Sequence, residues 1–261
     1  MTTRRRIVPA LALVLWLNGA MPTWCEHLVV ALSSHRVQIT SSFAGTELVL
    51  FGSVERDDQT VARVRGYDIV VKVSGPPQAE VTRRKERVLG IWVNAESRTF
   101  VEAPGYLAFL SNRPVTEIAG PEVLRRNQIG LDYILLPQLI SGDIGDVPPN
   151  DPFRAAFLRL NREHGLYREV PNAVTFLTPT LFRAVIPLPA NIPTGTYVVD
   201  VKLLNDGVVL APSNSAIEIQ KVGFEQFVAS SAREHGLLYG LATAGLALLT
   251  GWLASVVFRR D

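Results

Sequence analysis

Four histidines are the residues best suited to metal or acid–base chemistry: His27, His35, His164 and His235. No pair of them forms an HxH or HExxH arrangement, so the sequence predicts no zinc site built from neighbouring ligands. If export leaves Glu26 as the first residue, His27 stands second and could hold copper beside the free amine. A terminal copper chelate favours histidine at the first or third position, so a structural role for His27 is the preferred interpretation. No cofactor is expected.

Serine chemistry is the second candidate, at Ser33-Ser34-His35. Adjacent residues of a strand point to opposite faces, so Ser34 and His35 are poorly placed as nucleophile and base. The glycine-bounded elbow GxSxG, which exposes a nucleophilic serine, does not occur in the sequence. The phosphate loops GxxxxGK and GxGxxG are also missing. We therefore expect no enzymatic activity, and an uncharacterised hydrolase remains an alternative.

An acidic loop, Ser141-Gly142-Asp143-Ile144-Gly145-Asp146, continues towards Asn150-Asp151 and could gather oxygen ligands for calcium. It lacks the alternating oxygen ligands and the closing glutamate of an EF-hand loop. Its content of Gly, Pro and Asp is equally that of a turn followed by a helix cap. The turn is the favoured interpretation.

A basic run, Arg83-Arg84-Lys85-Glu86-Arg87, could bind an anion, a lipid head group or a partner protein. Alternate residues of a strand share a face, so Arg83, Lys85 and Arg87 would form one patch. Charge on an exposed hairpin edge also protects against aggregation, and such a solvated edge needs the same residues. Both interpretations stay open.

The amino-terminal 25 residues have the organisation of a signal peptide. Arg4-Arg5-Arg6 precedes an uncharged, mostly apolar run of 11 residues from Ile7 to Leu17, which is short for a membrane span. Removal of residues 1–25 takes three of the 26 basic side chains and leaves 23 against 24 acidic ones, a net charge of −1. A near-neutral body gives no reason to expect nucleic acid as a partner.

The only cysteine, Cys25, lies at the end of this segment. Cleavage after Cys25 or after Ala20 fits the pattern, and bulky Trp24 argues against a lipoprotein. If Cys25 leaves with the signal, the mature protein has no disulfide and no cysteine nucleophile. A body of about 200 residues can then fold on its hydrophobic core alone.

The carboxyl terminus predicts a transmembrane helix at residues 236–258. This stretch of 23 residues carries no charge, and a helix of that length spans roughly 35 Å. Arg259 and Arg260 follow it and, by the positive-inside rule, form a cytoplasmic tail with residue 261. The protein is thus expected to be a type I single-pass membrane protein whose body lies outside the cytoplasm.

Small residues recur along one side of this helix and could let a second helix approach closely. The stripe comprises Gly236, Gly240, Ala244, Ala247, Gly251 and Ser255.

The body between the two ends is predicted to be mainly β, an immunoglobulin-like β-sandwich with a small helical segment. Residues 26–115 contain seven short apolar runs, the spacing of such a sandwich. Continuous runs such as Ile69-Val70-Val71 suggest strands covered on both faces. The usual pair of cysteines is missing, although Trp92, on an expected strand from Val88 to Asn94, could still anchor the core.

Residues 116–223 are expected to form a mixed helix and β lobe, followed by a link at 224–235. Asp151 and Pro152 resemble the start of a helix, with Phe153, Ala156, Phe157 and Leu160 on its apolar face and Arg154 largely off that face. Asn205-Asp206-Gly207 predicts a hairpin turn. The strands after Pro171 either pack with the helices or complete the first sheet.

Several short motifs resemble an uncharacterised family of predicted transmembrane proteins of alphaproteobacteria. They include Leu50-Phe51-Gly52, Gly90-Ile91-Trp92-Val93, Ser111-Asn112-Arg113-Pro114, Leu181-Phe182-Arg183-Ala184 and Gly195-Thr196-Tyr197. The resemblance spans nearly the whole mature chain. The resemblance implies a signal peptide with a terminal anchor, and it implies a bacterial inner membrane with the body in the periplasm. It implies no activity.

A non-enzymatic accessory or interaction module for a membrane or envelope complex is therefore expected, whose partners are the membrane and another membrane or periplasmic protein. The alternative is a periplasmic module that binds or senses a small molecule or metal ion. That alternative predicts a cleft lined by aromatic residues such as Tyr106, Tyr133 or Tyr167.

Overall fold

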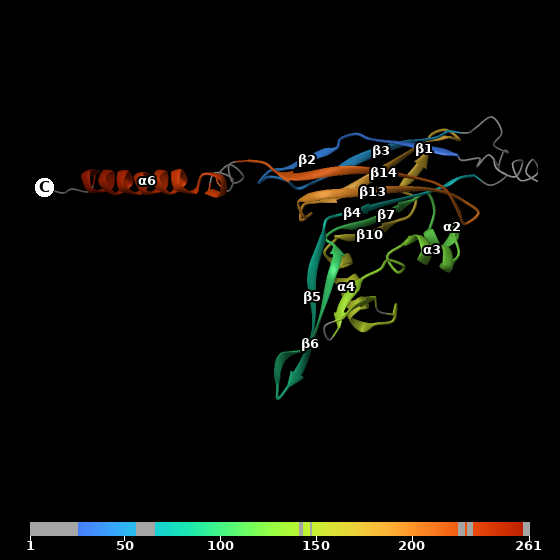
Figure 1. The fold of residues 1–261 in the computed structure, drawn as a ribbon, viewed down its shortest axis with the longest axis horizontal. Helices are drawn as coiled ribbons and strands as arrows, with labels where there is room; N and C mark the ends of the chain where they lie inside the picture. Colours follow the sequence, from blue (N-terminus) through green and yellow to red (C-terminus); the bar gives the residue numbers. More distant parts are fainter. Residues whose placement is uncertain are drawn as a thin grey trace, which may run out of the picture.

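Two facing β-sheets form the body of the protein in the computed structural model, which describes residues 26–55, 66–140, 143–146, 148–223, 228 and 232–257. The first sheet has the order β1 (His27–Leu32), β3 (Gly45–Glu55), β12 (Leu181–Pro189) and β11 (Val174–Phe176). The second has the order β10 (Tyr167–Val170), β7 (Leu107–Ser111), β4 (Asp68–Ser74), β13 (Gly195–Asn205), β14 (Val208–Lys221) and β2 (Arg36–Ile39). Figure 1 shows the two sheets as adjacent layers.

The strand order is that of an immunoglobulin-like sandwich, which confirms the predicted fold class. The order β1-β3-β12-β11 corresponds to the A-B-E-D sheet, and β14-β13-β4-β7 corresponds to G-F-C with an added strand. Tyr197, near the start of β13, donates a hydrogen bond of 2.6 Å to the carbonyl of Pro193. This is the tyrosine corner found at the same place in many such sandwiches.

In the six-stranded sheet, strands β4 and β7 are buried on both faces. One face packs against the four-stranded sheet through residues such as Ile69, Val71 and Phe182. The other packs, through Val70 and Phe109, against three helices: α2 (Val115–Ile118), α3 (Pro121–Asn127) and α4 (Pro152–Glu163). Because Ile69, Val70 and Val71 of β4 lie between two cores, this part of the strand is continuously apolar, as predicted.

The sheets do not follow the predicted boundary between lobes at residues 115 and 116. β12 pairs with β3 and β13 pairs with β4, both antiparallel. Strands from the two predicted lobes, 26–115 and 116–223, therefore share both sheets, as in the alternative in which the later strands complete the first sheet. The physical reason is that the few strands after Pro171 bury their apolar faces only by pairing with earlier ones.

Helix α4 presents a different face to the core from the one predicted. Its N-cap is Asp151, whose side chain accepts a hydrogen bond from the backbone of Arg154, as expected. The side chain of Arg154 is buried, however, and donates to the carbonyl of Ile134 at 2.6 Å. Leu160 is instead exposed. Arg154 faces inward because the carbonyl groups of Asp132 and Ile134, in the segment that follows α3, accept hydrogen bonds from its side chain.

The hairpin turn predicted at Asn205-Asp206-Gly207 is confirmed, since β13 and β14 flank it and Asp206 and Gly207 both have positive φ. The strand predicted from Val88 to Asn94 is only partly correct, because a turn interrupts it and only Ile91–Asn94 continues as one strand. Leu89 and Gly90 form a second tight turn, between β5 (Pro77–Val88) and β6 (Ile91–Pro104). The sequence shows an apolar run there, but no neighbouring element covers it.

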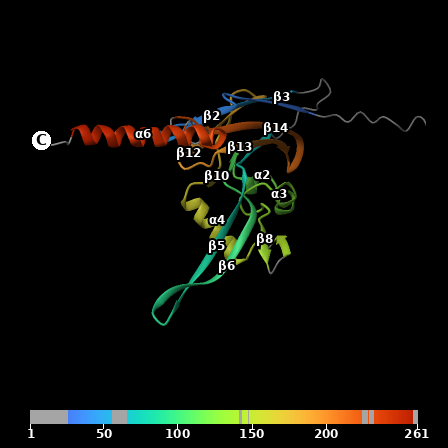
Figure 2. The same cartoon turned by 60° about the vertical axis from the view of Figure 1, so that its left-hand side comes forward.

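The hairpin of β5 and β6 leaves the sandwich between β4 and β7 and projects away from it (Figure 2). Near its base it is joined by β8 (Pro137–Ile140) and β9 (Asp143–Asp146), two strands that the sequence pattern did not predict. β6 pairs with β8 only at Thr99 and Phe100. The rest of the hairpin has no third strand among the described residues.

The chain ends in helix α6 (Gly236–Val257), which is 22 residues long. Its residues 236–255 have a mean hydropathy of 1.6, and none of them is buried against the body. The helix is long and apolar enough to cross a membrane. The predicted span is therefore present as a helix, whereas Arg259 and Arg260 lie outside the described residues.

Candidate functional site

The most exposed part of the body is the outer half of the β5–β6 hairpin, residues 83–97, here called the arm. Every side chain of the arm is exposed. Its base is held firmly: the ring of Phe100 stacks on Phe157 of α4 at 4.2 Å between centroids, and Arg98 lies 5.5 Å from the ring centroid of Phe153. The arm therefore projects from a packed base.

The predicted basic patch lies on one face of the arm. Arg83, Lys85 and Arg87 occupy alternate positions of β5, and Arg87 is the direct strand partner of Trp92. The indole is 68% exposed, so Trp92 is not the core anchor that the sequence suggested. Arg84 lies on the opposite face, where it bonds Glu86 at 2.6 Å. One face thus combines an aromatic ring with three cations that form no ion pair with any described residue, although Arg87 donates to the carbonyl of Gly90 at 3.4 Å.

The tip of the arm is apolar and strained. Leu89 is 99% exposed and has φ of 49°, and the flanking Val88 and Ile91 are also exposed. A branched residue in the left-handed region costs roughly 1–2 kcal/mol, and Gly or Asn would be usual there. Exposed apolar area combined with backbone strain is typical of a binding surface.

A cavity of about 500 Å³ is the second candidate site. It lies between the six-stranded sheet and residues 128–135 of the helical layer. Lys72 of β4 and Asp200 of β13 are direct strand partners on its floor, and Asn214 of β14 lies opposite Asp200. The sequence analysis missed this site. Its one available signal was Lys72, a lone cation within an apolar strand.

The two charged groups on the floor of this cavity differ in their partners: Asp200 has two, whereas Lys72 has none among the described residues. Asp200 Oδ2 accepts from Lys202 Nζ at 2.7 Å. With the amide of Asn214 oriented to donate, its nitrogen lies 3.0 Å from Asp200 Oδ1. Lys72 makes no hydrogen bond or ion pair with any described residue. Burial, and then repulsion from Lys202, lower the pKa of Lys72 below its ordinary value, against an opposing attraction from Asp200.

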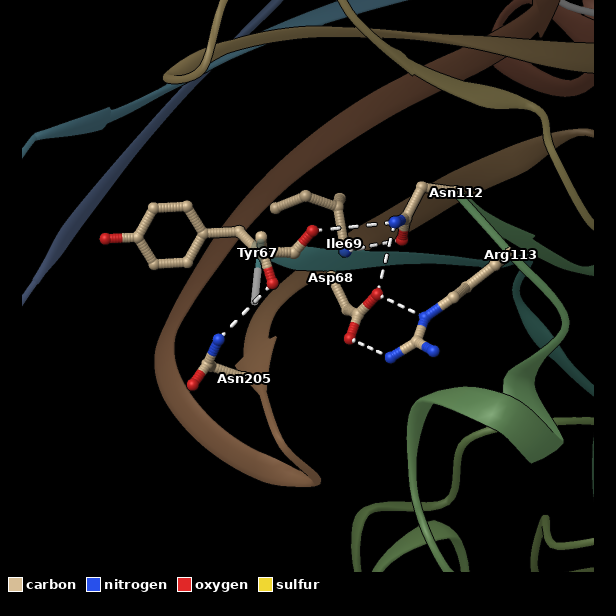
Figure 3. Close-up of polar contacts among 7 residues, drawn as sticks. Tyr67, Asp68, Ile69, Asn112, Arg113 and Asn205 are labelled. Atoms are coloured by element: carbon tan, nitrogen blue, oxygen red, sulfur yellow. Dashed lines mark hydrogen bonds and ion pairs between the residues drawn. The ribbon is translucent and has the colours of Figure 1, made fainter. Parts of the chain in front are cut away.

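The third candidate site is a polar cluster that joins the start of β4 to the residues just after the end of β7 (Figure 3). Asp68 is buried and accepts two hydrogen bonds from Arg113, at 2.7 and 2.6 Å. Asn112 donates to Asp68 at 3.1 Å and accepts from the backbone of Ile69 at 2.9 Å. All these groups satisfy one another, so the Ser111-Asn112-Arg113-Pro114 motif holds β4 to β7 and leaves no reactive group.

The residues considered for catalysis are not brought together. His27 is exposed and lies 3.7 Å from Glu55. The hydroxyl of Ser33 accepts from the backbone of Val49 at 3.1 Å, and that of Ser34 donates to the carbonyl of Arg36 at 2.7 Å. Both serines therefore serve turns.

The acidic loop that was considered as a calcium site has other structural roles. Ser141 and Gly142 lie outside the described residues, Asp143 and Asp146 belong to β9, and Asp151 caps α4. Within the described ranges, no three His, Cys, Asp or Glu side chains gather as a metal site.

The three tyrosines expected in one aromatic cleft are not brought together: Tyr106 packs in the core between the sheets, whereas Tyr167 packs in the core under the helices and lines a polar pocket with Arg162. Tyr106 and Tyr167 are buried, and their hydroxyls donate to the carbonyls of Pro187 and Pro104. None of the three tyrosines lines the cavity beside Lys72. The positions of tyrosines in the sequence cannot distinguish a residue that lines a cleft from a core residue whose hydroxyl bonds a backbone carbonyl.

The small residues of α6 lie within about 100° of one another around the helix axis. They are Gly236, Gly240, Ala244, Ala247, Gly251 and Ser255, and all are exposed. A Cβ atom at any of the four glycines of this helix would meet nothing within 4 Å in the described structure. They are Gly236, Gly240, Gly245 and Gly251. Helix packing through this stripe stays a prediction.

An immunoglobulin-like body, followed by an apolar helix able to span a bilayer, defines the class: a membrane protein with one candidate span among the described residues. The chain belongs to the family described as "Putative transmembrane protein (Alph_Pro_TM)", whose model matches residues 27–260. The resemblance seen in the short motifs is thereby confirmed. No curated protein and no solved structure matches the chain.

Proposed function

We propose that this protein is a non-enzymatic accessory of a membrane or envelope complex and binds another protein through its arm. The observation that carries this proposal is the arm itself: residues 83–97 are exposed throughout, with an apolar, strained tip at Leu89. A partner suited to it has an apolar groove bordered by carboxylates, because Arg83, Lys85 and Arg87 share the face of Trp92.

The backbone of the arm favours a protein over a lipid surface as its occupant. Between Thr99 and the tip, the two outer edges of the hairpin carry N–H and C=O groups that have no strand partner among the described residues. Hydrocarbon would leave such groups unsatisfied at a cost of several kcal/mol each. A strand of a partner protein would pair with them.

The topology proposed with this function is type I. The features that support it are the signal-like residues 1–25, the apolar helix α6 and the pair Arg259 and Arg260 after it. In a bacterium the body would then lie in the periplasm, anchored in the inner membrane. A periplasm-active reporter fused upstream of Arg233 is expected to be active. A fusion active only with a cytosolic reporter would reverse this topology.

The arm can be tested by photocrosslinking in intact membranes. A photoreactive residue at Leu89 is expected to give a discrete crosslink to one membrane or periplasmic protein. The matched control carries the same residue at Val208, which is 61% exposed on β14, and should give no such product. Co-purification of the same protein in mild detergent should be lost when Trp92→Ala and Ile91→Ser are combined. Crosslinks to lipid alone, or equal products from both positions, would refute the proposal.

A second candidate function is the binding of a small molecule. The observation that favours it is the cavity of about 500 Å³ beside Lys72, a volume within the usual range of ligand sites.

A further inference from the structure

On the floor of the cavity, Lys72 and the neighbouring Lys202 outnumber the one carboxylate beside them, that of Asp200. Both oxygens of that carboxylate already have partners, Lys202 and Asn214. The ammonium of Lys72 is left partly buried without an ion pair in the described structure, which is costly unless a counter-charge arrives.

The opposite wall does not supply this counter-charge. Glu102, near the base of the hairpin, also lines the cavity, but its side chain is exposed and it forms no ion pair with Lys72 among the described contacts. Glu102 is also not among the groups that shift the pKa of Lys72. The remaining polar groups of the lining are uncharged hydrogen-bonding groups: Ser74, Thr196, Gln128 and Asn214.

The rest of the lining is apolar. It consists of three prolines together with Leu107, Ile134, Leu135 and Val198. A cavity of about 500 Å³ is far larger than an inorganic ion needs. Charge at one place and apolar walls at another suit a molecule with both an anionic group and a short hydrocarbon body.

We propose that this cavity binds a small organic anion, such as a short-chain carboxylate, whose charged group is held by Lys72 and whose apolar part rests on Leu107, Ile134 and Leu135. The hydroxyl groups of Ser74 and Thr196 line the same cavity and can donate hydrogen bonds to the anion. This site is independent of the arm, since the two share no residue.

Isothermal titration of the full chain in detergent tests the proposal. The probes are sodium acetate, sodium butyrate, sodium sulfate and the neutral analogue butyramide. Butyrate is expected to bind more tightly than acetate or sulfate, and butyramide at least about tenfold more weakly than butyrate, because only the anion meets Lys72. Equal affinities for butyrate and butyramide, or no binding of any probe, would overturn the inference.

Matched variants locate the site. Lys72→Met removes the charge and keeps the stem, and should weaken butyrate at least about tenfold. Lys221→Met, at the exposed end of β14, should leave the affinity unchanged. Leu135→Trp fills the apolar wall without changing charge and should also abolish binding. Unchanged affinity in Lys72→Met or in Leu135→Trp would refute the assignment. Crosslinking from Leu89 should be unaffected by Lys72→Met, so this test and that of the arm fail separately.

Discussion

The ring of Phe182 lies directly over the backbone of Gly52. The two residues are strand partners in the four-stranded sheet, and a Cβ atom at Gly52 would lie 2.2 Å from Cζ of Phe182. Phe182 is fully buried, so its ring has nowhere to move. The motifs Leu50-Phe51-Gly52 and Leu181-Phe182-Arg183-Ala184, far apart in the chain, thus meet as one packing unit.

Gly52→Ala is expected to lower the free energy of unfolding by about 1–3 kcal/mol, because the added methyl group overpacks the core against Phe182. Urea denaturation followed by circular dichroism in detergent measures the change. Gly120→Ala is the control, since a Cβ atom there would meet nothing within 4 Å. Equal stability of the two variants would contradict the packing argument.

Arg113→Met is expected to lower the free energy of unfolding by about 2 kcal/mol, because it leaves the carboxylate of Asp68, which is only 5% exposed, without its main partner. The double variant with Asp68→Asn should lose less than the sum of the single variants. Arg125→Met, which breaks an exposed pair with Glu122, should change stability by less than about 0.5 kcal/mol. Additive losses would show that the pair is not coupled.

The protein is expected to lose stability steeply above pH 10. Burial raises the pKa of Tyr106, Tyr167 and Tyr197 above the ordinary value of 10.0. The folded state therefore keeps these protons at pH values where the unfolded chain releases them, so unfolding is favoured as pH rises. Each tyrosine contributes about 1.4 kcal/mol per pH unit in that window.

Tyr197→Phe provides the control for this pH dependence. It should lower stability at pH 7 by about 1 kcal/mol, through loss of the hydrogen bond to Pro193. It should also reduce the slope above pH 10 by one tyrosine's share, about 1.4 kcal/mol per pH unit. Denaturation curves at pH 7, 10 and 11 give both quantities. An unchanged slope would show that this hydroxyl ionises in the folded state.

Leu89→Asn is expected to raise the free energy of unfolding by about 1 kcal/mol, because Asn tolerates positive φ better than Leu. The same variant should weaken partner capture through the arm. Leu89→Ala keeps the strained backbone but loses the side chain, so it should weaken capture without gaining stability. Retention of full capture by both variants would show that the tip is not the binding element.

The arm shows where sequence reasoning failed. An uninterrupted apolar run from Val88 to Val93, with Gly90 within it, predicts a buried strand as readily as an exposed turn, because the pattern records side-chain type and not what covers it. The same limit applies to Arg154, a charged residue that became buried because carbonyl groups of a distant loop accept its hydrogens. The site at Lys72 was missed because the charged residues beside it, Asp200 and Lys202, are more than a hundred residues away in the sequence.

The sequence by itself determined the features that depend on local pattern. These are the uncharged span at residues 236–258, the β character of the body, the cap at Asp151 and the turn at Asp206-Gly207, each of which rests on the transfer energy or backbone preference of neighbouring residues. Only the tertiary structure decided which strands share a sheet, that the arm stands uncovered, and that Lys72 lies beside Asp200 on the floor of a cavity. Those relationships join residues distant in the chain, and burial and charge pairing between them depend on how the sheets and helices pack.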